Sequence, residues 1–204
     1  MGASPFRCGA AGLVRILVAV GNYPPGPGGG GIRAHRTYCR LMQQHPMQVT
    51  AVTPAGRGVA KGYSVLDDIE VIRTAPNRSV ARQFTSLAAA LRKHGPFDVV
   101  HAMGMSSIAM AAAAWAQIMR LKMIRELTMD SPLPAGRGVS ARVHRRGFLK
   151  ADLVVALANT MKDNLIALGV DQSRVWLRPN PVDVRQFYPV SYTHLTLPTI
   201  PRWC

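Results

Sequence analysis

The stretch Ile16-Leu-Val-Ala-Val20, followed by Gly21 and then by Gly28-Gly-Gly-Gly31, decides the fold class of this chain. A continuous apolar run of this length is typical of a strand buried on both faces of a parallel sheet. The glycine run leads straight into residues 31–44, which have helical character until His45-Pro46 ends them. This strand and helix form the first of several such units along the chain.

The same alternation continues to residue 178. We expect further strands at residues 49–53, 69–72, 98–101, 121–127, 152–157 and 175–177. We expect further helices at residues 80–93, from Ser106 or Ser107 to Met119, and from Asn159 or Thr160 to Leu168. Short apolar strands that alternate with helices of about 10–15 residues predict an α/β domain with a doubly wound, Rossmann-like parallel sheet.

The sequence changes character after this domain. In Arg178-Pro-Asn-Pro-Val-Asp183 the prolines on either side of Asn180 end the last strand, and we interpret residues 179–189 as the start of an interdomain linker. Residues 190–204 are too few for another core, and they resemble a translated sequencing adapter, so we expect them to be non-native. Residues 1–12 are interpreted as an extension and residues 13–178 as one domain, which is half of a larger protein.

The charge balance is the compositional outlier. The chain has 25 Lys and Arg against 10 Asp and Glu, a net charge of +15, which attracts nucleic acid, acidic lipid head groups or phosphorylated substrates. Its three cysteines, Cys8, Cys39 and Cys204, are scattered, which argues against a disulfide framework or a zinc site and favours a reducing compartment. No apolar run reaches the roughly 18 residues of a spanning helix. We therefore expect a cytoplasmic protein.

Ligands of open parallel sheets bind at the carboxyl ends of the strands, so the residues that follow each strand are the candidate site. The backbone N–H groups of Gly29, Gly30 and Gly31 can point at an anion at the start of the first helix. Arg33, in the first turn of that helix, can reach the same phosphate.

Two other strand ends carry polar groups. His101 closes the strand at residues 98–101, and Arg125, Glu126 and Asp130 lie at the end of the strand at residues 121–127. Two acids and an arginine are costly to bury unless they pair or bind a ligand. We therefore expect His101, Glu126 and Asp130 to contact substrate in a cleft, although a core position for His101 is an equal alternative.

The segment from Arg137 to Lys150 interleaves basic residues with apolar ones. Such a segment can lie on an anionic membrane surface, and it is equally typical of a solvated helix face. The pattern by itself leaves both interpretations open.

Two other functional classes compete. Gly26-x-Gly28-x-x-Gly31 has the spacing of a dinucleotide fingerprint, but Asn22 to Pro25 separate it from its strand, and Thr53-Pro54 replaces the ribose-binding acid. An NADP-type oxidoreductase module, with Arg57 on the 2′-phosphate, is the first alternative. A basic, non-enzymatic nucleic-acid-binding domain is the second, but aromatic residues are only 6% of the chain and no motif is present, so specific binding is not expected.

The order of the motifs resembles the amino-terminal domain of GT-B-fold retaining glycosyltransferases of the family-four class. The matching segments are the first strand with its glycines, Asp98-Val-Val-His101, Arg125-Glu126, Ala151-Asp-Leu-Val-Val-Ala-Leu157, and Arg178-Pro-Asn-Pro-Val-Asp183 with Phe187-Tyr-Pro189. Asn180 and Asp183 fall in the part that resembles the interdomain signature of that family.

The resemblance implies transfer of a sugar from a nucleotide-sugar donor to an acceptor, with retention of configuration and without a metal or other cofactor. It implies that Gly30 and Gly31 approach the donor phosphates and that His101 lines the cleft near the transferred sugar. The acceptor would be a sugar, a lipid-linked or a phosphorylated molecule, and the enzyme would contact the anionic inner face of a membrane peripherally. Because the second domain supplies most donor contacts in that family, we expect this chain alone to be inactive.

Overall fold

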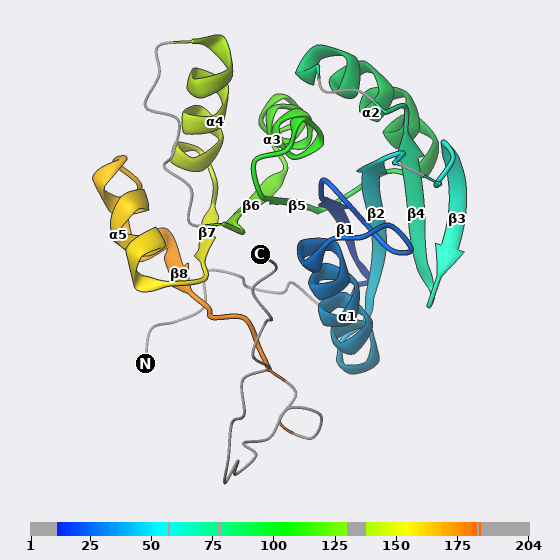
Figure 1. Ribbon diagram of the computed structural model, residues 1–204, viewed down its shortest axis with the longest axis horizontal. Coiled ribbons are helices and arrows are strands. Elements are labelled where there is room, and N and C mark those ends of the chain that lie inside the picture. The colour runs from blue at the N-terminus through cyan, green and yellow to red at the C-terminus, as the bar shows by residue number, and fades with distance from the viewer. Residues whose placement is uncertain (1–11, 57, 77–78, 130–137, 183, 185–204) are drawn as a thin grey trace, which may run out of the picture.

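The protein forms a single twisted sheet flanked by helices (Figure 1). The computed structural model describes residues 12–56, 58–76, 79–129, 138–182 and 184. Within those residues eight strands pair in the order β3-β4-β2-β1-β5-β6-β7-β8. Their bounds are β1 Val14–Ala19, β2 Met47–Pro54, β3 Gly62–Leu66, β4 Ile69–Thr74, β5 Val99–Met103, β6 Lys122–Leu127, β7 Leu153–Ala156 and β8 Val175–Leu177.

The helices occupy the connections between strands. They are α1 Gly29–Gln44, α2 Val80–His94, α3 Ser107–Met119, α4 Val139–Leu149 and α5 Asn159–Ala167, and a short 3-10 turn, Gln172–Arg174, precedes β8. Ser106 caps α3, since its Oγ accepts a hydrogen bond from the N–H of Ala109 at 3.4 Å. Among the described residues no helix has the length and apolar character needed to cross a membrane.

The doubly wound sheet predicted from the alternating pattern is confirmed. All the pairings between the described strands are parallel except β3 with β4. The sequence reading did not find β3, because this strand lies at the edge of the sheet and its side chains alternate between exposed and half-buried, with Tyr63 and Val65 open to solvent. It therefore lacks the continuous apolar run that marks the central strands.

The hand of the connections distributes the helices unequally over the two faces of the sheet. The chain runs from β1 outward to β2 and β4, and then from β5 outward to β8 in the opposite direction. Crossovers between parallel strands are right-handed, so α1 lies on one face and the helices after β4 cover the other. Figure 1 shows α1 across the sheet from α2, α3 and α4.

Each face has its own apolar cluster. On the face of α1, Val18 and Val71 pack with Ala34 and Tyr38 of the helix. On the other face, Val100 and Val154 belong to a larger cluster built around the alanine-rich helix α3. A sheet buried on both faces explains why its central strands read as uninterrupted apolar runs.

Candidate functional site

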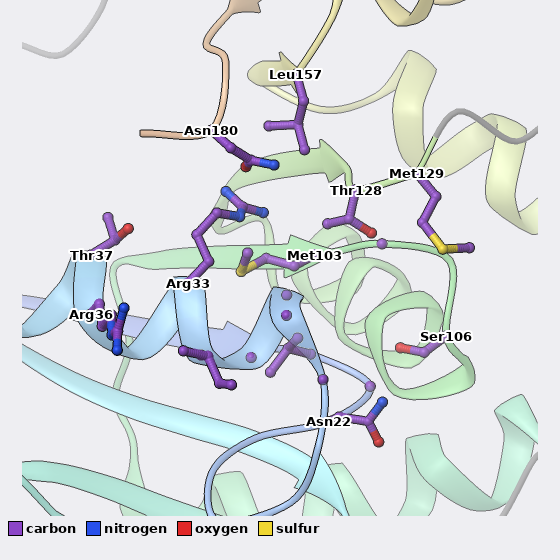
Figure 2. Close-up of a pocket in the computed structure, with 18 of the residues that line it drawn as sticks. Asn22, Arg33, Arg36, Thr37, Met103, Ser106, Thr128, Met129, Leu157 and Asn180 are labelled. Carbon is purple, nitrogen blue, oxygen red and sulfur yellow. The ribbon is translucent and has the colours of Figure 1, made fainter. Parts of the chain in front are cut away.

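An open cavity of about 870 Å³ lies at the carboxyl ends of the central strands (Figure 2). It is lined by the residues that follow β1, β5 and β6 and by the first turns of α1, with Leu157 and Asn180 on a further side. This is the edge at which open parallel sheets bind their ligands. In Figure 2 Arg33 extends from α1 toward Thr128 and Asn180, while Asn22 and Ser106 lie elsewhere on the rim.

The first turn of α1 forms one wall of the cavity, and its glycines differ in what surrounds them. A Cβ on Gly31 would overlap the carbonyl oxygen of Asn22 and would lie 3.0 Å from the Cα of Tyr23. Gly29 and Gly30 would meet no heavy atom within 4 Å. Gly31 therefore lets the helix pack on the loop after β1, whereas Gly29 and Gly30 leave the helix backbone open to the cavity.

The amino terminus of α1 has no side-chain cap. Gly28 is the N-cap residue and supplies no side-chain cap, and the first turn contains no acidic residue. The N–H groups at the start of a helix have no partner within the helix, and the helix dipole adds a partial positive charge there. Since the predicted residues Gly29, Gly30 and Gly31 all line the cavity, this helix end is suited to bind an anion.

A chain of buried polar side chains fixes Arg33. Its guanidinium donates to Glu126 Oε1, and the other carboxylate oxygen of Glu126 lies 3.3 Å from His101 Nε2. The second ring nitrogen of His101, Nδ1, is 2.8 Å from the hydroxyl of Tyr38. The side chains of Glu126 and His101 are 4% and 11% exposed, so these contacts form under the cavity floor. Arg33 is held from below and presents the rest of its guanidinium to the cavity.

The electrostatics of this chain favour an ionised Glu126. Burial by itself would raise the pKa of Glu126, but the hydrogen bonds and charges of His101 and Arg33 outweigh burial and lower that pKa below its ordinary value of 4.5. Burial, and next the charge of Glu126, raises the pKa of Tyr38. Tyr38 therefore remains a neutral phenol beside His101.

The structure brings together most of the predicted site residues. Gly29, Gly30, Gly31, Arg33 and Asn180 line the cavity. Glu126 and His101 lie behind Arg33, and His101 is buried rather than among the lining residues. Asp130 and Asp183, like Arg57, fall outside the residues that the structure describes.

Arg125 does not share the site of Glu126, which corrects the expectation from its position at a strand end. Successive side chains of a strand point to opposite faces, so Arg125 projects away from α1. Its guanidinium donates to the carbonyl of Gly104 at 3.0 Å and stacks on Phe148 with 4.5 Å between the guanidinium carbon and the ring centre. Full burial lowers the pKa of Arg125 to about 10. Arg125 is a core residue: its two terminal NH groups donate to backbone carbonyls, and its buried Nε has no hydrogen-bond partner among the described residues.

Several lining residues were not singled out from the sequence. Thr128 follows β6 directly, and Ser106 was noted only as a helix cap. Asn22 follows β1, and its backbone receives the close approach of Gly31. The signal that marks all three is their place immediately after a strand or before a helix at the carboxyl edge of the sheet.

The basic segment from Arg137 to Lys150 forms α4, and its apolar side has a structural explanation. Phe148 is fully buried and belongs to the core cluster around α3, and Ala141 is buried as well. Arg142, Arg145 and Arg146 are exposed. Apart from Val139 at its start, which is exposed, this helix therefore presents mainly charged residues to a partner.

The dinucleotide-fingerprint spacing lacks the geometry that fingerprint needs. Gly26 donates to the carbonyl of Tyr23 in a turn of the loop, well before α1 begins at Gly29. β2 ends at Thr53-Pro54, and Thr53 is buried, so no acid stands there to bind a ribose.

Comparison with known proteins gives one family match and several solved structures of similar fold. Residues 27–186 match the family model described as Glycosyltransferase Family 4. No curated protein sequence matches the chain.

Solved structures share the fold at low sequence identity. A putative UDP-N-acetylglucosamine 2-epimerase from Listeria monocytogenes has a TM-score of 0.55 and 15% identity over 81% of this chain and 44% of its own. Anabaena HepE, solved with UDP and glucose, has a TM-score of 0.60 and 17% identity over 84% of this chain and 46% of its own. The Neisseria meningitidis UDP-GlcNAc 2-epimerase, solved with UDP-GlcNAc, has a TM-score of 0.52 and 16% identity over 80% of this chain and 45% of its own. The chain thus spans less than half the length of these structures.

The two helix glycines give a matched pair of substitutions. Gly31→Ala should lower the free energy of unfolding by about 2 kcal/mol or more, because the new methyl group overlaps the backbone of Asn22. Gly30→Ala should raise it by about 0.5–1 kcal/mol, because alanine favours the helix and meets no atom there. Urea unfolding of both variants measures the difference, and equal effects of the two substitutions would contradict the close approach at Gly31.

Glu126→Gln should remove the buried ion pair with Arg33 and, with it, a contribution to the free energy of unfolding that depends on pH. At about pH 7 this substitution should lower the free energy of unfolding by roughly 3–5 kcal/mol, because Arg33 is left without its carboxylate partner. Folding lowers the pKa of Glu126, so its contribution is present above its ordinary value of 4.5 and is lost as the pH falls through the lower folded-state pKa.

The stability gap between the two proteins should therefore narrow on acidification. Urea unfolding at about pH 7 and at stepwise lower pH checks this. The matched control is Asp163→Asn, an exposed acid on α5, which should change stability by less than about 0.5 kcal/mol. A gap that stays constant with pH would show that Glu126 is not ionised in the folded chain.

Proposed function

We propose that this chain, which belongs to Glycosyltransferase Family 4, is the acceptor-side half of an enzyme that transfers a sugar from a nucleotide-sugar donor to an acceptor with retention of configuration. One observation carries the proposal. The cavity joins the free N–H groups of the first turn of α1 with Arg33, whose guanidinium Glu126 holds in place. These groups are complementary to the diphosphate of such a donor.

The chemistry that these residues supply is binding and charge stabilisation. As the bond between sugar and diphosphate breaks, negative charge accumulates on the departing phosphate, and fixed N–H donors and a guanidinium stabilise that charge. Glu126 is committed to Arg33 and His101, and its side chain is 4% exposed, so its role is to hold Arg33 rather than to attack the sugar. Gly29 and Gly30 keep side chains out of the path of the phosphates, and Gly31 lets the helix seat on the loop after β1.

The remaining donor contacts are proposed to come from a second domain that faces this cavity. The cavity is open on one side, and the linker residue Asn180 stands on its rim. The sugar and the nucleotide base of the donor need groups beyond those that line the cavity here. Residues 1–189 alone are therefore proposed to bind a nucleotide diphosphate weakly and to lack turnover, whereas the parent enzyme transfers sugar.

Binding of UDP and UDP-sugars tests the site directly. Arg33→Ala should weaken binding of UDP by about tenfold or more, since a hydrogen bond to a charged group contributes about 1.5–3 kcal/mol. Arg40→Ala removes the same charge from an exposed position on the same helix outside the cavity and should change affinity by less than about threefold. Isothermal titration calorimetry of the three proteins checks the difference.

The alternatives separate in the same experiment. Equal losses of UDP affinity in Arg33→Ala and Arg40→Ala would show that binding depends only on the overall charge of +15. Saturable binding of NADPH without binding of UDP would favour the oxidoreductase alternative. If the parent enzyme converted UDP-GlcNAc to its 2-epimer without an acceptor, its activity would be epimerisation and not the proposed sugar transfer.

The acceptor is proposed to be a sugar, a lipid-linked or a phosphorylated molecule, with peripheral contact between α4 and an anionic cytoplasmic membrane face. The exposed Arg142, Arg145 and Arg146 support this through charge, since the apolar side of α4 is in the core. Changing all three to Gln should weaken sedimentation with phosphatidylserine vesicles by about tenfold or more, at about 1 kcal/mol per charge. The matched control changes Arg40, Arg82 and Arg92 to Gln. Unchanged binding of the α4 variant would overturn the membrane contact.

A further inference from the structure

Three metal-ligating side chains meet outside the cavity, between α1 and the turn that joins β3 to β4. His35 and Cys39 lie on α1, and Asp67 lies in the turn. One ligand atom from each residue falls within 4.8 Å of the other two. The i, i+4 spacing of His35 and Cys39 puts both side chains on one stripe of the helix, and Asp67 closes the group from the edge of the sheet.

The distances between these atoms approach those of a filled zinc site. His35 Nε2 is 2.9 Å from Asp67 Oδ2 and 3.7 Å from Cys39 Sγ. Bonds of about 2.0–2.3 Å in a tetrahedral zinc site place the ligand atoms about 3.3–3.7 Å apart. Shifts of a few tenths of an ångström in the exposed side chain of Asp67 are enough to admit the ion.

A hydrogen bond from outside the group orients the imidazole. The hydroxyl of Tyr23 lies 3.0 Å from His35 Nδ1, and the two rings meet edge to face. This contact engages Nδ1 and leaves Nε2 beside Asp67, while Cys39 Sγ lies next to the ring, 3.7 Å from Nε2 and 3.9 Å from Nδ1. A partner on the second ring nitrogen is the usual arrangement for a metal-binding histidine, because it fixes the tautomer and the ring orientation.

The turn that carries Asp67 is shaped for its position. Asp67 and the next residue, Asp68, both have a positive φ, 47° and 63°, as in the two-residue hairpin turns that usually contain asparagine and glycine. Asp67 points to His35 from this turn. Asp68 is not a member of the group.

Within the described part of the chain, no arginine or lysine forms a hydrogen bond or an ion pair with His35, Cys39 or Asp67. Burial, and next the charge of Asp67, raises the pKa of the Cys39 thiol. The nearby Arg73 is engaged elsewhere, since its guanidinium donates to Ser64 Oγ and to the carbonyl of Pro24, each at 2.7 Å. A cation placed among the three ligand atoms would stabilise both the thiolate and the carboxylate.

We infer that His35, Cys39 and Asp67 form a binding site for a divalent transition metal of the zinc type, with water in the fourth position. One nitrogen, one thiolate sulfur and one carboxylate oxygen suit Zn²⁺ and Co²⁺ and not Mg²⁺ or Ca²⁺, which prefer oxygen ligands. Binding releases the thiol proton of Cys39 to solvent. The ion ties α1, whose first turn lines the cavity, to the β3–β4 edge of the sheet.

Cobalt is the probe, because a bond between Co²⁺ and a thiolate gives a charge-transfer absorption that reports the cysteine directly. Untagged, reduced protein of the full 204 residues is titrated with Co²⁺, and Zn²⁺ is then added to displace it. We expect one equivalent of Co²⁺ with the charge-transfer band and its loss on addition of Zn²⁺. Cys39→Ser should abolish the band, and Cys8→Ser should retain it.

A second pair of variants keeps the test valid if Cys39→Ser impairs folding. Asp67→Asn removes the carboxylate but suits a positive φ, so the turn is preserved. It should weaken Zn²⁺ binding by at least about tenfold, as the loss of even an outer-shell partner does. Asp68→Asn makes the same change one residue away and should alter affinity by less than about threefold.

The outcomes decide between a metal site and a plain ion pair. Stoichiometric binding that needs Cys39 and Asp67 but not Cys8 or Asp68 supports the site. Absence of the band in the wild-type protein, or equal affinities in Asp67→Asn and Asp68→Asn, would overturn it. In that case the contact of His35 with Asp67 is a surface ion pair only.

Discussion

The first turn of α1 packs directly on the backbone of Asn22 and Tyr23, and this close approach sets the geometry of the cavity. Only a residue without a Cβ fits at position 31. With the helix seated there, Arg33 reaches across to β6 and meets Glu126, and Tyr38 meets His101 of β5. One contact between backbones thus positions a helix end, an arginine and the polar chain beneath it.

The two neighbours Arg125 and Glu126 show how one strand serves two environments. Glu126 faces α1, where Arg33 and His101 keep it ionised. Arg125 faces α3 and α4, where carbonyl groups and the ring of Phe148 surround it. Both charges are almost fully buried, and each is stabilised by different contacts. A buried charge is tolerated where hydrogen bonds replace most of those it makes with water, and residues on both sides of β6 supply such bonds.

The sequence was sufficient for the fold because the central strands are buried on both faces. The runs Ile16–Val20 and Leu153–Leu157 are apolar without interruption and alternate with helical patterns, and this combination is typical of a parallel sheet covered by helices. The edge strand β3 was not predicted, because many of its side chains face water and the periodicity of so short a segment is weak. The sequence of α4 indicated only a basic segment, and the burial of Phe148 depends on core residues that lie far from it in the sequence.

Local position in the sequence was enough to place some of the predicted site residues at the cavity, whereas contacts between distant residues could not be foreseen. Gly29, Gly30, Gly31 and Arg33 follow a strand and open a helix, so their place on the cavity could be expected. The partner of Arg33 could not be predicted in this way, since Glu126 lies 93 residues away in the sequence. For the same reason Cys39 read as one of three scattered cysteines, although the fold places it beside His35 and Asp67.

The central place of β1 in the sheet has a consequence for synthesis on the ribosome. β1 is made first and pairs with β2 soon afterwards, but its other neighbour is β5. Asp98, which receives a hydrogen bond from the N–H of Arg15, follows it by 83 residues. Until that segment emerges, the nascent chain carries an open strand edge in the middle of its future sheet, with apolar side chains on both sides of it. Such an edge is a template for pairing with another chain, so the interval before β5 arrives is the period in which this domain most needs protection by chaperones.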